Sequence, residues 1–416
     1  MCSKKNKYFE NKLHCQIISS DYDITNIIAL PGGGIPAIFY STGILYALHK
    51  SNILLKKTDE KYNFNDSFVI TASSGGVVPL LLLQCILCNN LQNSRNDWFE
   101  HYLIKTVDLI KPIYMIHLYI TSLLKSMCVY TGNFNEIVRI CNNDIHGLLL
   151  NILPPEIING KSLFFDKDMN SHMLYNYIID SAYNDSPEIS NDFSHLNDMN
   201  IITQLSEIIT TCCIAISFSE LKSGILNDSA LSVDCDIIQI EKYKNLKSIY
   251  YYSLNAYDSK TNNCYREPFL FTISNFNDRS SKITNYKSIS KLRDFASKNG
   301  NNIDFKMIVL PNKYSPIRKY NNKIYNELVQ DIFFQNDFSY ILNFSGILNN
   351  DPRMIQLILL IGAFETMYIF DTPIETVNKL TDLLPVVYKQ ILDDPYNVYF
   401  KKDPLSILTR LFNTRF

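Results

Sequence analysis

The sequence is poor in glycine and tryptophan and has almost no net charge. It holds 13 glycines and a single tryptophan among 416 residues, and its formal net charge is −2. A chain without excess positive charge has no overall basic field with which to collect nucleic acid, so we expect no nucleic-acid partner. Because glycine is scarce, the three consecutive glycines at positions 32–34 stand out.

Clean apolar runs and an ordered cysteine pattern are also missing. The longest apolar stretches, 113–130 and 354–370, contain polar or charged residues and fall short of the about 20 apolar residues that a membrane span needs. The polar, lysine-rich N-terminus is unlike a secretory signal. The ten cysteines suggest neither a disulfide framework nor a zinc site. We therefore expect an intracellular protein, soluble or peripherally bound to membranes, that uses no metal and no other cofactor.

Apolar patterning predicts the fold class. Short β-branched runs predict buried strands at 24–30, 67–71, 247–254 and 303–310. Helical spacing of apolar residues predicts helices at 36–50, 77–88 and 201–218, and the polar stretch 56–66 predicts a loop. Two strand–glycine turn–helix units in succession predict an α/β fold, with a central, largely parallel sheet flanked by helices.

The chain shows no internal repeat and no stretch of linker-like composition. From residue 322 onward, its pattern is almost entirely helical. We therefore expect one α/β domain over residues 1–320, with a helical C-terminal part, 321–416, packed on the same domain.

Ser74 lies in the segment Ala72-Ser73-Ser74-Gly75-Gly76, between a predicted strand and a predicted helix. A nucleophilic serine needs a tight strand-to-helix turn, where small neighbours let the backbone turn and the substrate approach. The following helix directs its N-terminal amides and the positive end of its dipole toward the serine. The usual pattern is Gly-x-Ser-x-Gly, and here Ala72 replaces the first glycine. A turn of small residues that only packs a helix is the alternative.

Gly32, Gly33 and Gly34 also lie between a predicted strand and a predicted helix. Glycines in this place leave backbone N–H groups uncovered, and such a nest binds an oxyanion or a phosphate. The loop is not a Walker loop, because no Lys-Ser/Thr follows it. A dinucleotide fingerprint would need glycine at position 37, which is Ala37. A merely permissive turn remains the alternative.

The two glycine-rich junctions, about 40 residues apart, together resemble the patatin-like phospholipase family. Its members carry a glycine-rich loop, a Gly-x-Ser-x-Gly turn and an aspartate in an Asp-Gly-Gly or Asp-Gly-Ala turn, and work with a Ser–Asp dyad without histidine. In this chain, the segment Asn227-Asp228-Ser229-Ala230 resembles the aspartate turn, and it follows a small-residue segment at 211–218. The resemblance covers residues 24–255.

The resemblance implies a role for each matching residue. Ser74 would be the nucleophile and Asp228 the general base, and the amides of the oxyanion hole would come from Gly32, Gly33, Gly34 and Gly75. The substrate would be a fatty-acyl ester of a (lyso)phospholipid or related lipid, presented at a membrane surface. The sequence departs from the family at Pro36-Ala37, where Arg-Gly is usual, at Ala72, and at Ser229, where glycine is usual.

Three alternatives stay open on the sequence alone. The first is a catalytically weak or lapsed patatin fold that serves as a lipid-binding or protein-interaction module. The second is a histidine-based triad, although none of the seven histidines lies beyond Asp228. The third is a phosphate site on the glycine nest, which lacks the usual lysine. The apolar stretch 113–130 is the expected membrane contact, with ordinary core packing as its alternative.

Overall fold

The computed structural model describes the following residues: 24–32, 34–58, 61–64, 67–72, 74–88, 96–101, 143, 145–147, 149–150, 173–175, 202–203, 205–206, 209, 219–221, 224–226, 245–254, 289–290, 292–297, 303–310, 318–330, 352–373 and 380.

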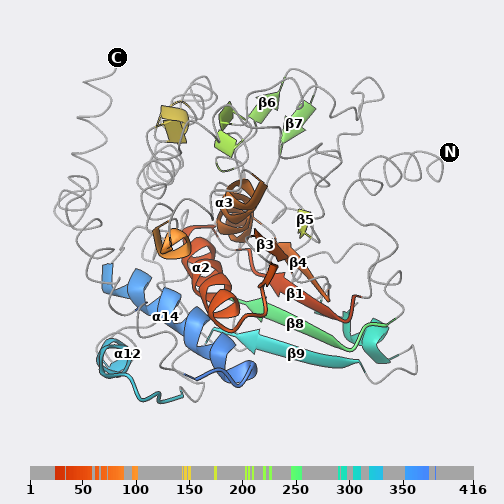
Figure 1. Cartoon of the computed structure of the whole chain (residues 1–416), viewed down its shortest axis with the longest axis vertical. Coiled ribbons are helices and arrows are strands. Elements are labelled where there is room, and N and C mark those ends of the chain that lie inside the picture. The colour runs from red at the N-terminus through yellow and green to blue at the C-terminus, as the bar shows by residue number, and fades with distance from the viewer. Residues whose placement is uncertain are drawn as a thin grey trace, which may run out of the picture.

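The centre of the molecule is a five-stranded parallel sheet (Figure 1). Its strand order is β5-β4-β1-β8-β9, and every neighbouring pair is parallel. The strands are β1 (Asn26–Leu30), β4 (Phe68–Ala72), β5 (Met173–Tyr175), β8 (Ser248–Ser253) and β9 (Asp304–Val309). The predicted α/β class with a largely parallel sheet is confirmed at this level of detail.

Helices and helical segments cover both faces of the sheet. On one face, the segments 289–290 and 292–297 pack on residues that alternate along three strands, and these are Ile27, Ala29, Ile249, Tyr251, Phe305 and Met307. The other face carries α2 (Gly34–Lys50) and α14 (Pro352–Ile369) (Figure 1). A strand buried on both faces must be apolar throughout, which is why β1 reads as a continuous apolar run.

Helix α2 is buried almost all round, between the sheet and α14. Every residue from Ala37 to Leu48 is buried, as expected of a helix that is apolar on all sides. Its Tyr40 ring lies edge-on to Tyr252 of β8, with the ring centroids 6.2 Å apart. The Tyr252 hydroxyl lies 3.0 Å from Thr366 Oγ1 of α14, so strand and both helices meet there.

The two helices touch backbone to backbone. A Cβ added at Gly43 of α2 would lie 2.1 Å from the Leu359 carbonyl oxygen, and one at Gly362 of α14 would lie 2.4 Å from the Tyr40 carbonyl oxygen. Only a hydrogen atom fits at either place, so both glycines are required by the close approach of the helices.

Helices α2 and α14 run in the same direction and end in the same way. Asn52 and Asp371 have positive φ angles of 56° and 48°, and each follows its helix as the left-handed residue of a Schellman cap. In each cap, the next residue donates to a carbonyl five residues back, as Ile53 N does to Leu48 O at 3.0 Å and Thr372 N to Met367 O at 2.9 Å. Thr372 Oγ1 also donates to Ser51 Oγ at 2.6 Å, which ties the two helix ends together.

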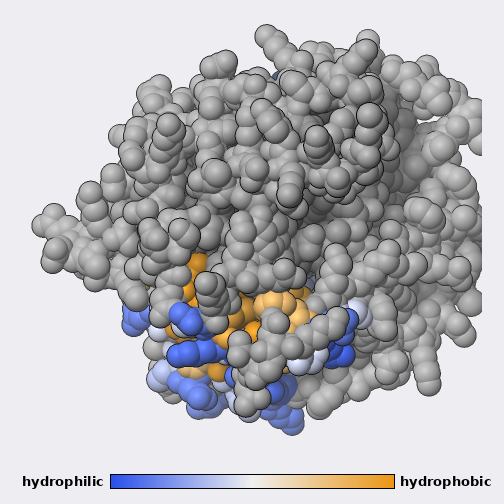
Figure 2. Space-filling model, turned by 90° about the vertical axis from the view of Figure 1, so that its right-hand side faces the viewer, coloured by the Kyte–Doolittle hydropathy of each residue, from blue (hydrophilic) through white to orange (hydrophobic). Residues whose placement is uncertain are grey.

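The remaining described elements include one more buried helix and several short segments. They are the 3₁₀ turn η1 (Ser74–Gly76), helices α3 (Val77–Cys88) and α12 (Lys323–Leu328), and two antiparallel hairpins, β2 (Leu55–Thr58) with β3 (Lys61–Phe64) and β6 (Ser219–Leu221) with β7 (Gly224–Leu226). On the face shown in Figure 2, apolar described residues lie between hydrophilic ones.

The structure corrects one local prediction. Residues 56–66 were expected to form a loop, but Leu55–Thr58 and Lys61–Phe64 pair as an antiparallel hairpin. The polar composition misled the prediction, because Lys56 and Lys57 give no apolar alternation that would indicate a strand. The predicted strands at 24–30, 67–71, 247–254 and 303–310 and the predicted helices at 36–50 and 77–88 are confirmed to within a few residues.

The helix–helix contact gives a first testable expectation. Gly43→Ala should lower the free energy of unfolding by about 1–3 kcal/mol or more, because the added methyl meets backbone that cannot rotate away. Gly147→Ala is the matched control, since a Cβ at Gly147 would meet nothing within 4 Å. Urea denaturation of both variants measures the difference, and equal stabilities would contradict the contact between α2 and α14.

Candidate functional site

The two glycine-rich junctions leave the sheet side by side. Strands β1 and β4 are neighbours, and their last residues, Leu30 and Ala72, are register partners. Gly32 and Ser74 each follow two residues beyond these partners. Because β1 and β4 are parallel, both segments emerge at the carboxyl edge of the sheet.

The segment after β1 and the turn after β4 are in direct contact. A Cβ added at Gly76 would lie 2.4 Å from the Pro31 carbonyl oxygen and 3.2 Å from Ser41 Oγ of α2. Gly75 and Gly76 are both buried. The missing side chain at Gly76 therefore lets η1 rest on the backbone that leads into the glycine loop.

Two helices begin at this edge. Helix α2 starts at Gly34, and α3 starts at Val77 directly after η1. Each helix has unpaired N–H groups in its first turn and the positive end of its dipole at its start. The edge therefore combines backbone donors from two helix starts, an arrangement that favours negative charge developing between them.

The order of the strands also marks this edge as a ligand site. From β1, the chain crosses through α2 to β4 on one side, whereas β8 and β9 lie on the other side. In open α/β sheets, ligands bind beyond the carboxyl ends of the strands where the direction of winding reverses. In the described sheet this point lies between β1 and β8, next to the loop that begins at Pro31.

The structure brings some of the predicted site residues together and is silent on others. Gly32, Gly34, Ser74 and Gly75 lie at the shared edge by their backbone positions. Gly33 and Asp228 lie outside the described residues, as do 113–130, 211–218 and Ser229, so the roles assigned to them stay predictions. The strand β7 ends at Leu226, two residues before Asp228, and pairs with β6 and not with the central sheet.

Sequence reasoning missed Ser41. Its side chain is fully buried on α2 beside Gly76, and its hydroxyl has no hydrogen-bond partner among the described residues. A buried hydroxyl without a partner costs about 1–3 kcal/mol. The signal in the sequence was a polar pair, Ser41 and Thr42, within an apolar helix, of which Thr42 bonds back to the Ile38 carbonyl at 2.6 Å.

His49 lies at the opposite end of α2. It follows Gly34 by 15 residues (49 − 34), which corresponds to roughly 22 Å along a helix. Its ring stacks on Phe99 with centroids 4.3 Å apart and meets Trp98 edge-on at 5.4 Å. Burial, and then the charge of Lys50, lowers the pKa of His49 to about 4. An imidazole at this end of α2 is too far from the glycine loop to be the base for Ser74.

Comparisons with known proteins give no family assignment: no protein-family model matches the chain, and no curated protein resembles it in sequence. Within the described part of the chain, no helix is long and apolar enough to cross a membrane. The same residues contain no group of at least three His, Cys, Asp or Glu side chains placed to hold a metal ion.

The contact at Gly76 can be tested by adding a methyl group. Gly76→Ala should separate η1 from Pro31, because both contacting atoms nearest the new Cβ on that side belong to backbone. We expect a loss of about 1–3 kcal/mol of stability and faster amide hydrogen exchange in peptides around 31–38 and 72–80. Protection equal to that of wild type would show that the two segments are not in contact.

His49 predicts a pH dependence of stability. Its folded pKa of about 4 lies below the ordinary value of 6.5, so the unfolded chain binds the proton more tightly. The contribution of His49 to the free energy of unfolding should thus be fully present above pH 6.5 and should be lost as the pH decreases toward 4. Replacing His49 by Phe keeps an aromatic ring against Phe99 and should flatten this part of the profile. The measurement is the change in the urea midpoint of each protein between pH 7 and pH 4.5. An equal change in the wild type and in the variant would argue against a buried neutral His49.

Proposed function

We propose that the chain is a patatin-like serine acyl hydrolase that cleaves fatty-acyl esters of (lyso)phospholipids or related lipids. The observation that carries the proposal is the contact between Gly76 and the Pro31 carbonyl. This contact places the turn that contains Ser74 next to the segment that leads into the glycine loop. A nucleophile and its oxyanion hole must lie this close together.

The proposed reaction starts at Ser74. Its Oγ attacks the ester carbonyl carbon while the Asp228 carboxylate takes the hydroxyl proton. The backbone amides of Gly32, Gly33, Gly34 and Gly75 donate to the oxyanion of the tetrahedral intermediate. Collapse of the intermediate breaks the bond to the alcohol, which leaves with the proton from Asp228, and the acyl group stays on Ser74.

Water completes the cycle in a second half-reaction. Asp228 removes a proton from the water as it attacks the acyl-enzyme, and the resulting tetrahedral intermediate uses the same amides. Ser74 then leaves, recovers its proton from Asp228, and a fatty acid is released. One carboxylate therefore serves as base and acid in both halves, so the scheme requires no histidine.

The described departures from the family pattern are compatible with the fold. Ala72 is fully buried as the last residue of β4, so its methyl group is accommodated where the family has glycine. Pro36 lies in the first turn of α2, where a missing N–H removes no intrahelical hydrogen bond. Ala37 is fully buried in the same helix. Pro36 removes one possible amide donor from the helix start, so the oxyanion would depend more strongly on the glycines before it.

A fluorophosphonate probe tests the proposal directly, because it reacts with an activated serine. We expect the wild-type chain to be labelled and to release fatty acid from lysophospholipid vesicles. Ser74→Ala should abolish both, and Asp228→Asn should lower turnover by about a hundredfold or more. Ser73→Ala is the matched control, since it removes the neighbouring hydroxyl.

The outcomes separate the hydrolase from its main alternative. Labelling that survives in Ser74→Ala would show that another residue is the nucleophile. A folded wild-type chain that binds lipid vesicles without labelling or fatty-acid release would favour the lapsed, lipid-binding form of the same fold.

A further inference from the structure

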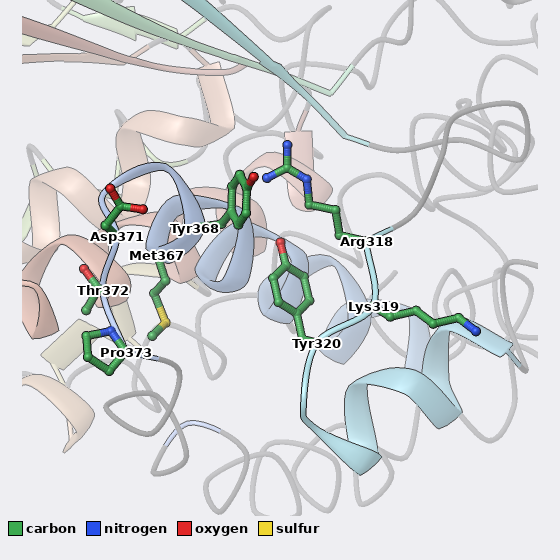
Figure 3. Close-up of a pocket in the computed structure, with 8 residues that line it drawn as sticks. All are labelled: Arg318, Lys319, Tyr320, Met367, Tyr368, Asp371, Thr372 and Pro373. Atoms are coloured by element: carbon green, nitrogen blue, oxygen red, sulfur yellow. The ribbon is translucent and has the colours of Figure 1, made fainter.

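A cavity lies beside the C-terminal end of α14, far from the glycine loop. It has a volume of 660 Å³ and is lined by Arg318, Lys319, Tyr320, Met367, Tyr368, Asp371, Thr372 and Pro373 (Figure 3). Thr372 bonds to Ser51, which follows the end of α2. The glycine loop stands before the start of α2, so this cavity and the proposed hydrolase site lie toward opposite ends of that helix.

One end of the cavity holds Arg318, which forms an ion pair with Glu365 but makes no hydrogen bond to another described residue. The guanidinium carbon of Arg318 lies 3.5 Å from the centroid of the Tyr368 ring, which holds the planar group flat. In that ion pair, Arg318 Nη1 lies 3.8 Å from Glu365 Oε2, a distance beyond that of a hydrogen bond, so the N–H groups of the guanidinium stay available. Glu365 already accepts a hydrogen bond from the Tyr320 hydroxyl at 2.9 Å. Arg318 therefore presents an oriented fork to an anion.

The other end holds a carboxylate without an ion pair. Asp371 is exposed, and none of the ion pairs between described residues includes it. Lys306, whose pKa is raised by its hydrogen bond to Asp304 and only weakly by Asp371, stays within 3.2 Å of Asp304. Because Asp371 caps α14, the negative end of the helix dipole adds to its charge. This end of the cavity favours a cation.

The two charges lie on opposite sides of an aromatic ring. In the view of Figure 3, the Tyr368 ring lies between the Arg318 guanidinium and the Asp371 carboxylate, with Met367 below Asp371 and Tyr320 below Tyr368. Tyr368 is 56% exposed, and Arg318 covers one face of its ring, so a ligand would meet the rest of the ring.

We propose that this cavity binds a zwitterion of the phosphocholine type, with its phosphate on Arg318 and its ammonium group near Asp371 and the Tyr368 ring. A purely anionic ligand would leave Asp371 unfavourably close, and a purely cationic one would meet Arg318. The phosphate suits the bidentate geometry of a guanidinium, and a quaternary ammonium group suits an aromatic face.

This zwitterion occurs both as a free molecule and as a lipid head group. A head group held here belongs to a lipid that is not being cleaved, because the cavity is remote from Ser74. The proposal does not depend on the hydrolase activity, and it is tested in the full-length Ser74→Ala variant so that no lipid is consumed.

Isothermal titration with phosphocholine is the first measurement. We expect saturable binding that weakens at least tenfold in Arg318→Gln and in Asp371→Asn. Asparagine tolerates the left-handed backbone of position 371, so the second variant removes the charge and keeps the helix cap. Lys323→Gln is the matched control, because it removes an exposed cation of α12, 87% accessible, that does not line the cavity. It should bind like the parent.

Partial ligands and vesicles complete the test. Inorganic phosphate or choline alone should bind at least tenfold more weakly than phosphocholine. Co-sedimentation with phosphatidylcholine vesicles that Arg318→Gln abolishes would identify a lipid head group as the source, and binding of free phosphocholine alone would identify the soluble molecule. No binding of phosphocholine, or equal loss in Arg318→Gln and Lys323→Gln, would overturn the proposal.

Discussion

Helix α2 is buried along most of its length, and the direct contact of its backbone with that of α14 makes this burial possible. Gly43 and Gly362 remove the side chains that would otherwise hold the two helices apart. With α14 in place, Tyr40 and Tyr252 form a continuous apolar layer between helix and sheet. The position of α2 in turn fixes the glycine loop that precedes it, so the geometry of the candidate site depends on a contact made by residues more than 300 positions away in the sequence.

The candidate site itself rests on a third close approach of the same kind. At Gly76, as at Gly43 and Gly362, backbone stands where a Cβ would otherwise be. In a chain with only 13 glycines, these three positions fix how α2 lies against α14 on one side and against η1 on the other. The site is thus built mainly from backbone, and backbone amides at helix starts are the groups that stabilise an oxyanion without reorganising. The buried hydroxyl of Ser41 beside Gly76 is the polar exception in this packing.

Much of the sheet could be predicted from the sequence, because strands buried on both faces leave continuous apolar runs such as β1 and β8. The adjacency of Gly32 and Ser74 did not follow from the apolar pattern, because that pattern does not say that β1 and β4 are neighbours in the sheet. The hairpin of β2 and β3 could not be predicted, because Lys56 and Lys57 give no apolar alternation. The pairing of α2 with α14 could not be predicted from the sequence either. Both helices are apolar on nearly all sides, and such helices do not specify their partners by sequence pattern alone.

The pairing of α2 with α14 has a consequence for synthesis on the ribosome. Residues 34–50 emerge early, but their packing partner at 352–369 is made about 300 residues later. At typical rates of about 5–20 residues per second, this delay is roughly 15 to 60 seconds. During that time an apolar helix lacks its cover, and the long sequence separation makes its final docking slow as well. The nascent chain therefore has a period of exposed apolar surface in which chaperones, or aggregation with other chains, compete with folding.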